Sequence, residues 1–178
     1  MPPAIRYRML RALALMLALA GFVAAPAGSA SAAPALRTVN RTGVNLTGVN
    51  ARVSDLPPAL AKVFKRVNTI RAERGLPKLT LGLCLTERVA QPWAAQMART
   101  GDFEHRSMTS VRDKCPKNGW VGENIAYGYT SAKEVMRAWM NSPGHRANIL
   151  RPQYRRIGLG LQSDANGRVY WVQNFGGN

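Results

Sequence analysis

The chain has 178 residues, enough for one domain with a substantial buried core and some additional sequence. Its 25 Lys and Arg against 9 Asp and Glu give a formal net charge of +16, which predicts attraction to anionic partners such as acidic lipids or envelope polymers. The basic residues are dispersed and are not interleaved with aromatic residues, which argues against a specific nucleic-acid-binding surface.

Residues 1–32 have the pattern of a secretory signal peptide. Arg6, Arg8 and Arg11 precede an apolar run at 12–25, and Ala30-Ser31-Ala32 fits a small-x-small cleavage site. The apolar run is shorter than the ~20 residues that span a bilayer, so a retained membrane anchor is the weaker interpretation. We therefore expect a secreted monomer without a transmembrane anchor. Loss of the three leader arginines would leave it with a net charge of +13.

Export also decides how the two cysteines, Cys84 and Cys115, are interpreted. In an oxidising compartment an even number of cysteines is most simply explained by a disulfide, so we predict that these two pair. The alternative is a catalytic thiol, which would require a free cysteine beside a histidine.

Residues 33–56 contain few large apolar residues and are expected to form a flexible linker, with the folded domain at 57–178. The domain opens with apolar residues at helical spacing over 60–70. This spacing predicts an amphipathic helix with one buried face, capped by Asp55 and ended by Gly75.

A second helix is predicted over 86–100, where Pro92 either kinks the helix or moves its start later. After it, Asp102 is expected to cap a short turn that carries His105. Residues 107–119 are polar and predict a loop.

A strand is predicted over 121–129 from its β-branched and aromatic residues. Ser131 and Glu134 then have the spacing of a capping box, which predicts the start of another helix. Ser142-Pro143 is expected to begin a further helical turn, with Ser142 as its cap and His145 within it.

The chain ends in a predicted hairpin. Apolar residues alternate over 157–161 and 169–175, on either side of a turn at Asn166-Gly167. Gly158 and Gly160 share one face of the first strand, which predicts that another element packs close to that backbone. The whole pattern predicts an α+β domain in which helices cover both faces of a small, mainly antiparallel sheet.

Five motifs follow one another in the folded part of the chain. They are Phe103-Glu104-His105-Arg106-Ser107, Gly122-Glu123-Asn124-Ile125-Ala126, Trp139 to Leu150, Ile157-Gly158-Leu159-Gly160 and Tyr170 to Gly176. Together they resemble the CAP superfamily of cysteine-rich secretory proteins, antigen 5 and plant pathogenesis-related proteins, and in particular its bacterial secreted branch of SCP-domain proteins. The resemblance covers about 60–177 and implies a three-layer α-β-α sandwich.

The resemblance also implies a central cavity lined by two histidines and two acidic residues. By motif, His105, Glu123 and His145 take three of these positions. Many eukaryotic members have the second acid where this chain has Ser142. Glu134 is the nearest acid in sequence, but its place in the capping box explains it better.

Two neutral imidazoles and a carboxylate are suitable ligands for a divalent transition ion, zinc above all. His105, Glu123 and His145 are therefore the predicted metal ligands and also the candidates for catalysis. Alternatively, the carboxylate only fixes the tautomers of the histidines, and no cofactor is required. Asn124, Ser142 and Asn148 are expected to support the site rather than to react.

Three functions remain open. The first is a secreted binding module for a lipid or an anionic envelope polymer, which the binding roles of the family favour over catalysis. The second is a peptidase-like, metal-assisted hydrolase that uses the same cleft, although the sequence has no Gly-x-Ser-x-Gly motif. The third is a protein held to the envelope by its charge alone, whose binding would weaken steeply with salt.

Overall fold

The computed structural model describes residues 52–178. The predicted signal peptide and residues 33–51 of the expected linker lie outside the described part of the chain. The last linker residues form a 3-10 turn, η1 (Val53–Asp55), and Leu56 is buried in the core. Helices and strands follow this turn up to the end of the chain.

Asp55 caps its own turn and not the first helix. Its carboxylate accepts a hydrogen bond from the backbone N–H of Arg52, and Pro57 occupies the cap position of the helix that follows. The predicted capping role of Asp55 is therefore wrong, because this short carboxylate is already used one turn earlier.

Helical segments and strands are interspersed along the chain, and the last two strands are consecutive. In chain order they are α1 (Pro58–Ala72), β1 (Thr80–Leu81), the π-helix η2 (Leu85–Ala90), α2 (Gln91–Thr100), α3 (Met108–Lys114), β2 (Trp120–Tyr127), α4 (Ala132–Asn141), α5 (Pro143–Leu150), β3 (Arg156–Ser163) and β4 (Val169–Gly177). The strands form one sheet in the order β1-β3-β4-β2. β1 is parallel to β3, and the other two pairs are antiparallel.

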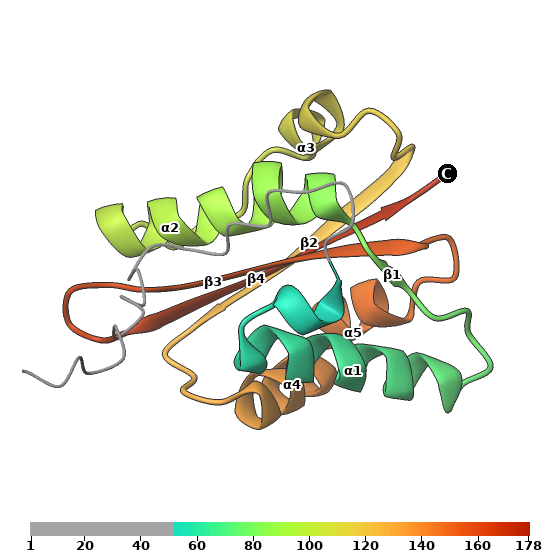
Figure 1. Ribbon diagram of the computed structural model, residues 1–178, viewed down its shortest axis with the longest axis horizontal. Coiled ribbons are helices and arrows are strands. Elements are labelled where there is room, and N and C mark those ends of the chain that lie inside the picture. The colour runs from blue at the N-terminus through green and yellow to red at the C-terminus, as the bar shows by residue number, and fades with distance from the viewer. Residues whose placement is uncertain (1–51) are drawn as a thin grey trace, which may run out of the picture. The chain divides into compact units, whose positions relative to one another are not determined.

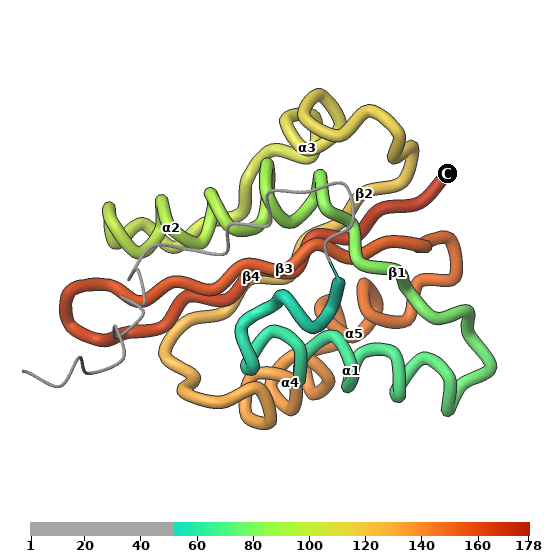
Figure 2. The backbone as a smooth tube through the Cα atoms, in the orientation of Figure 1, coloured from blue at the N-terminus to red at the C-terminus, as the bar shows by residue number. Residues whose placement is uncertain are grey.

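Helices cover both faces of this sheet (Figure 1 and Figure 2). α1, α4 and α5 lie on one face, whereas η2, α2 and α3 lie on the other. Each layer buries its own apolar cluster, with Val63 and Trp139 on the first face and Ala94 and Val172 on the second. The predicted three-layer α-β-α sandwich with a mainly antiparallel sheet is confirmed.

Gly158 and Gly160 allow η2 to lie directly on β3. A Cβ atom at Gly158 would collide with the backbone of Leu85, and one at Gly160 would collide with the carbonyl oxygen of Ala90. The prediction of close packing is confirmed. The π-helix η2 ends at Ala90, and α2 begins at Gln91, one residue before Pro92. The α-helix therefore starts later than residue 86, which is one of the two alternatives expected.

The prediction of a loop over 107–119 is wrong, because 108–114 form α3. A helix of two turns with mostly polar residues shows little apolar periodicity. What holds it is the burial of Val111 and Cys115, one turn apart, and the predicted Cys84–Cys115 disulfide, which is confirmed. The disulfide joins α3 to the start of η2.

Arg71 fixes the end of α5 against α1. Its guanidinium is fully buried and donates hydrogen bonds to the carbonyl oxygens of Pro77, Ile149, Arg151 and Tyr154. Burial, and then the charge of Arg155, lowers the pKa of Arg71. Because the carbonyls of Ile149, Arg151 and Tyr154 lie at and beyond the end of α5, Arg71 helps to set the position of the helix that carries His145.

Candidate functional site

The three predicted site residues lie around the outer edge of β2. Glu123 is in the middle of β2, His105 is in the segment between α2 and α3, and His145 is in the first turn of α5. In the described part of the chain β2 is the last strand of the sheet, so only one of its two edges is paired with another strand. The α2–α3 layer supplies His105 from one face of the sheet, and α5 supplies His145 from the other face. The two histidines are close enough for His105 to affect the pKa of His145.

The segment that carries His105 is irregular over 101–107. Gly101 ends α2 with a φ of +80°, a left-handed conformation that glycine adopts readily. The N–H of Asp102 donates to the hydroxyl of Thr100, and no helical turn forms before α3 begins at Met108. The predicted turn capped by Asp102 is therefore wrong.

Glu123 is the centre of the hydrogen bonds at this site. Its side chain is 1% exposed. Oε1 accepts from Nδ1 of His105 at 2.9 Å and from the backbone N–H of Arg106 at 3.2 Å. Oε2 accepts from Nδ2 of Asn174 at 3.1 Å. Three donors thus compensate the burial of the carboxylate, which would otherwise be costly.

This pairing determines the tautomer of His105. A carboxylate oxygen can only accept, so the proton of the neutral imidazole lies on Nδ1 and the lone pair lies on Nε2. The His105 side chain is 57% exposed, which leaves Nε2 accessible to a ligand.

His145, in the first turn of α5, is only partly exposed. Burial, and then the charge of His105, lowers the pKa of His145 below its ordinary value. The neutral imidazole is therefore favoured, and this is the form that binds metals.

The side-chain amides of Asn124, which is fully buried, and Asn148, which is partly buried, connect the segments that carry Glu123 and His145. Nδ2 of Asn124 donates to the backbone carbonyl of His145 at 3.1 Å. Nδ2 of Asn148 donates to the backbone carbonyl of Glu123 at 3.0 Å and to Oδ1 of Asn124 at 2.9 Å. The first turns of α5 are thereby attached to β2.

Ser142 occupies the N-cap position of α5, but its side chain makes no capping hydrogen bond. Glu134, by contrast, completes the predicted capping box of α4. Its carboxylate accepts from the N–H of Ser131, and the Ser131 hydroxyl accepts from the N–H of Glu134. This confirms the capping role of Glu134.

Sequence reasoning missed Arg106, Gln173 and Asn174. Gln173 and Asn174 belong to the motif Tyr170 to Gly176, but the partners of their side chains depend on strand register. β4 pairs Asn174 with Glu123 and Gln173 with Asn124. Arg106 lies 5.0 Å from the ring of Trp93, and burial lowers its pKa while the charge of Glu123 acts in the opposite direction.

Within residues 52–178 no three His, Cys, Asp or Glu side chains are grouped so as to hold a metal ion. Both oxygens of Glu123 are already hydrogen-bonded, so the available donors are Nε2 of His105 and the ring of His145. A carboxylate behind a histidine commonly orients it for metal binding. This donor set fits zinc with water in its other positions, and the metal assignment stays a prediction.

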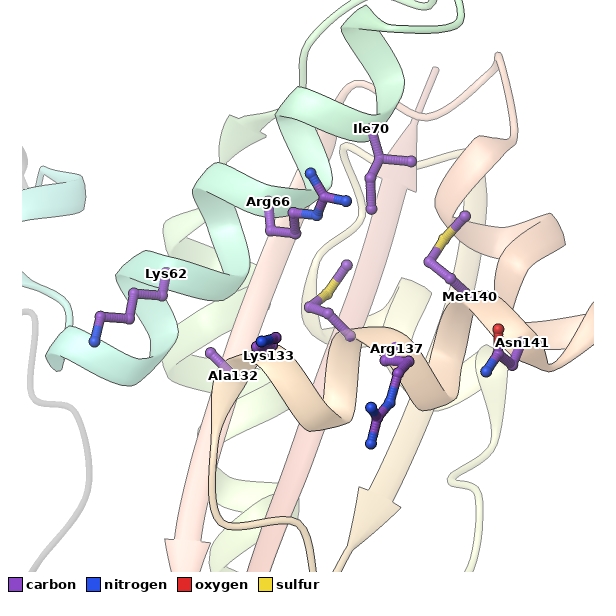
Figure 3. A pocket seen from close by; sticks show the side chains of 9 residues that line it. Lys62, Arg66, Ile70, Ala132, Lys133, Arg137, Met140 and Asn141 are labelled. Atoms are coloured by element: carbon purple, nitrogen blue, oxygen red, sulfur yellow. The ribbon is translucent and has the colours of Figure 1, made fainter.

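A second candidate site is a groove of ≈ 510 Å³ between α1 and α4 (Figure 3). Its apolar part is formed by Ile70, Ala132, Met136 and Met140. Its basic residues are Lys62 and Arg66 on α1 and Lys133 and Arg137 on α4. Apolar and cationic groups in one groove suit a ligand with an apolar chain and an anionic head.

Comparisons with known proteins agree with this fold and these motifs. A model of the cysteine-rich secretory protein family, CAP, matches residues 64–175. The Bacillus subtilis protein YkwD is 35% identical over 158 residues, which are 85% of this chain and 58% of YkwD. The chain therefore spans just over half the length of this relative.

Two solved structures share the fold. An outer surface protein of Borrelia burgdorferi has a TM-score of 0.62 at 18% identity, over 67% of this chain and 92% of that one. An extracellular SCP-domain protein of Bacillus anthracis has a TM-score of 0.55 at 28% identity, over 66% of this chain and 39% of that one.

No helix in residues 52–178 is long and apolar enough to cross a membrane. Since the family model matches more than half of the chain and bacterial relatives share its fold, the chain belongs to the CAP family, with a CAP domain of the bacterial type.

Proposed function

We propose that this CAP domain is an extracellular binding module for an anionic lipid of the cell envelope. The observation that carries the proposal is the α1–α4 groove, which combines an apolar floor with four basic side chains. Its volume of ≈ 510 Å³ lies within the range typical of small-molecule sites. The disulfide and the signal-peptide pattern support export, and the Bacillus anthracis relative is itself an extracellular protein.

Three of the four basic residues of the groove form no salt bridge in the described part of the chain. In the described part of the chain no salt bridge joins Lys62, Lys133 or Arg137 to a carboxylate, and Arg66 only approaches Glu73 at 3.9 Å on the surface. On each helix the two cations are four residues apart, a spacing at which like charges repel. An anionic head group would relieve this repulsion. The two pairs of like charges thus destabilise their helices slightly and favour the binding of an anion.

Calorimetric titration with dodecyl phosphate and with neutral monolaurin, both below their aggregation concentrations, tests the proposal. We expect the full chain to prefer dodecyl phosphate. Lys133→Gln with Arg137→Gln should weaken that binding by about tenfold or more, since it removes charge-assisted contacts. The matched control is Arg112→Gln with Lys114→Gln, which removes the same charge from α3 on the opposite face of the sheet. Equal losses in both double variants would refute a site in the groove and favour binding by net charge alone.

We further propose that His105 and His145 hold a divalent cation, zinc above all, with Glu123 orienting His105. The support is the 57% exposed side chain of His105, whose Nδ1 is bound to Glu123 so that Nε2 carries the lone pair, and the lowered pKa of His145, which favours its neutral form. When bound, zinc would supply Lewis acidity. Zinc should raise the melting temperature of the wild type, and His105→Ala with His145→Ala should abolish that rise. A rise of equal size in both proteins would contradict the assignment.

The alternative function is a peptidase-like, metal-assisted hydrolase at the same cleft. The specific observation in its favour is the His105–Glu123 pair, which leaves an oriented imidazole nitrogen accessible from solution. It requires turnover of a peptide or ester library that is lost both on chelation and in His145→Ala. Binding to the groove without such turnover supports the binding module.

A further inference from the structure

The groove is connected to the site of His105, Glu123 and His145, called the cleft in the proposal below, by a line of buried side chains. Met136 lines the groove and is 3% exposed. Its Sδ accepts a hydrogen bond from Nε2 of Gln173 at 3.7 Å. Oε1 of Gln173 accepts from Nδ2 of Asn124 at 3.0 Å, and the same Nδ2 donates to the carbonyl of His145. Gln173 and Asn124 are both fully buried.

We infer that occupancy of the α1–α4 groove is transmitted to the cleft around His145 through Met136, Gln173 and Asn124. The inference rests on the proposed function, because it requires a ligand in the groove. It adds that the two sites are coupled, so a ligand at the cleft changes the affinity of the groove by the same factor.

The hydrogen bond between Gln173 and Met136 is the link that a groove ligand can change. A thioether is a weak acceptor, and the Met side chain has three rotatable bonds. An apolar chain that packs on Met136 turns this sulfur away from Gln173. A buried amide donor left unpaired is costly, so the Gln173 carboxamide rotates to find another partner.

Rotation of Gln173 acts directly on Asn124, because its Oε1 accepts from the Asn124 amide. Asn124 in turn contacts both sides of the cleft. It holds the carbonyl of His145 on α5, and its Oδ1 accepts from Asn148, which also binds the carbonyl of Glu123 on β2. A change at Met136 therefore reaches the segments that carry His145 and Glu123 without any contact between the ligand and the cleft.

The chain provides a matched pair of variants. Met136 and Met140 both line the groove, but in the described residues only the sulfur of Met136 accepts a hydrogen bond from Gln173. Met→Leu keeps the apolar volume and is normally well tolerated in a packed interior. Met136→Leu therefore removes the acceptor, whereas Met140→Leu alters the same groove and leaves the line of hydrogen bonds intact.

The experiment is nuclear magnetic resonance of the full chain, titrated with dodecyl phosphate at constant pH and without metal. Saturation should shift the side-chain amide resonances of Asn124 and the backbone amide of His145 in the wild type and in Met140→Leu. In Met136→Leu the probe should still bind, with a Kd within about tenfold of the wild type, while these shifts are lost.

Shifts of equal size in Met136→Leu would overturn the inference. So would saturable binding to the wild type that leaves the Asn124 and His145 resonances unchanged, although the proposed function would survive that result. Failure of the probe to bind the wild type would overturn the proposed function and the coupling together.

Discussion

Glu123 is the residue on which the polar site most depends, because its carboxylate receives three hydrogen bonds from two separate segments of the chain. His105 and Arg106 bind one oxygen, and Asn174 binds the other. An amide in place of the carboxylate has one oxygen and one NH2 group, so at least one of these donors would face another donor.

Glu123→Gln should therefore lower the free energy of unfolding by about 1–3 kcal/mol, the usual cost of an unsatisfied buried polar group. Urea denaturation measures the loss. Glu87→Gln on the exposed side of η2 is the control and should change stability by less than about 0.5 kcal/mol. A loss no larger than that of the control would contradict the role assigned to Glu123.

His145 makes the stability of the fold depend on pH. Burial and the neighbouring His105 lower its pKa from the ordinary 6.5, so the unfolded chain binds a proton where the folded chain does not. The free energy of unfolding should thus fall as the pH drops below about 6.5 and level off below the pKa of the folded state. His145→Gln should flatten this part of the curve of urea midpoint against pH. Parallel curves for variant and wild type would contradict the shift.

The residues of the site were only partly predictable from sequence. His105, Glu123 and His145 stand in motifs, and Asn124 and Asn148 flank them in the same motifs. Asn174 and Gln173 reach the site only because β4 pairs with β2 in one register, and a shift by one residue would point both side chains to the opposite faces. No local pattern fixes that register.

The helices and strands that have a capping motif or an apolar periodicity in their own sequence were predicted. Those that are held mainly by contacts with distant parts of the chain were not. The capping box of Ser131 and Glu134 defines the start of α4 in a stretch of four residues. α3 depends instead on the disulfide and the burial of Val111, and the two residues of β1 become a strand only by pairing with β3.

The contact between η2 and β3 gives a prediction for one element. Gly160→Ala would drive a methyl group into the carbonyl oxygen of Ala90, so η2 must move. We expect a loss of about 1–3 kcal/mol in unfolding free energy, the usual cost of overpacking. Gly144→Ala on α5 is the control, because nothing lies within 4 Å of a Cβ there. Equal effects in the two variants would show that β3 and η2 are not closely packed.

For the whole molecule, the net charge of +16 and the groove predict different responses to salt. Retention on vesicles of anionic phospholipid should weaken steeply between about 0.05 and 0.5 M NaCl, because exposed charges are screened beyond about 8–10 Å. Binding of dodecyl phosphate should weaken less, since the apolar contacts of its chain are not screened. Identical salt dependence in both assays would mean that net charge explains all of the binding.

The side chains that hold the cleft have a further consequence for how the protein behaves at high concentration. β2 is an outer strand, and an open strand edge can pair with the edge of another molecule. Here the carbonyl of Glu123 accepts from Asn148, and the carbonyl of Ile125 accepts from the indole of Trp139. Two acceptors that could recruit a foreign strand are thus occupied from α5 and α4. The contacts that attach α4 and α5 to β2 therefore also protect the domain against aggregation through its sheet.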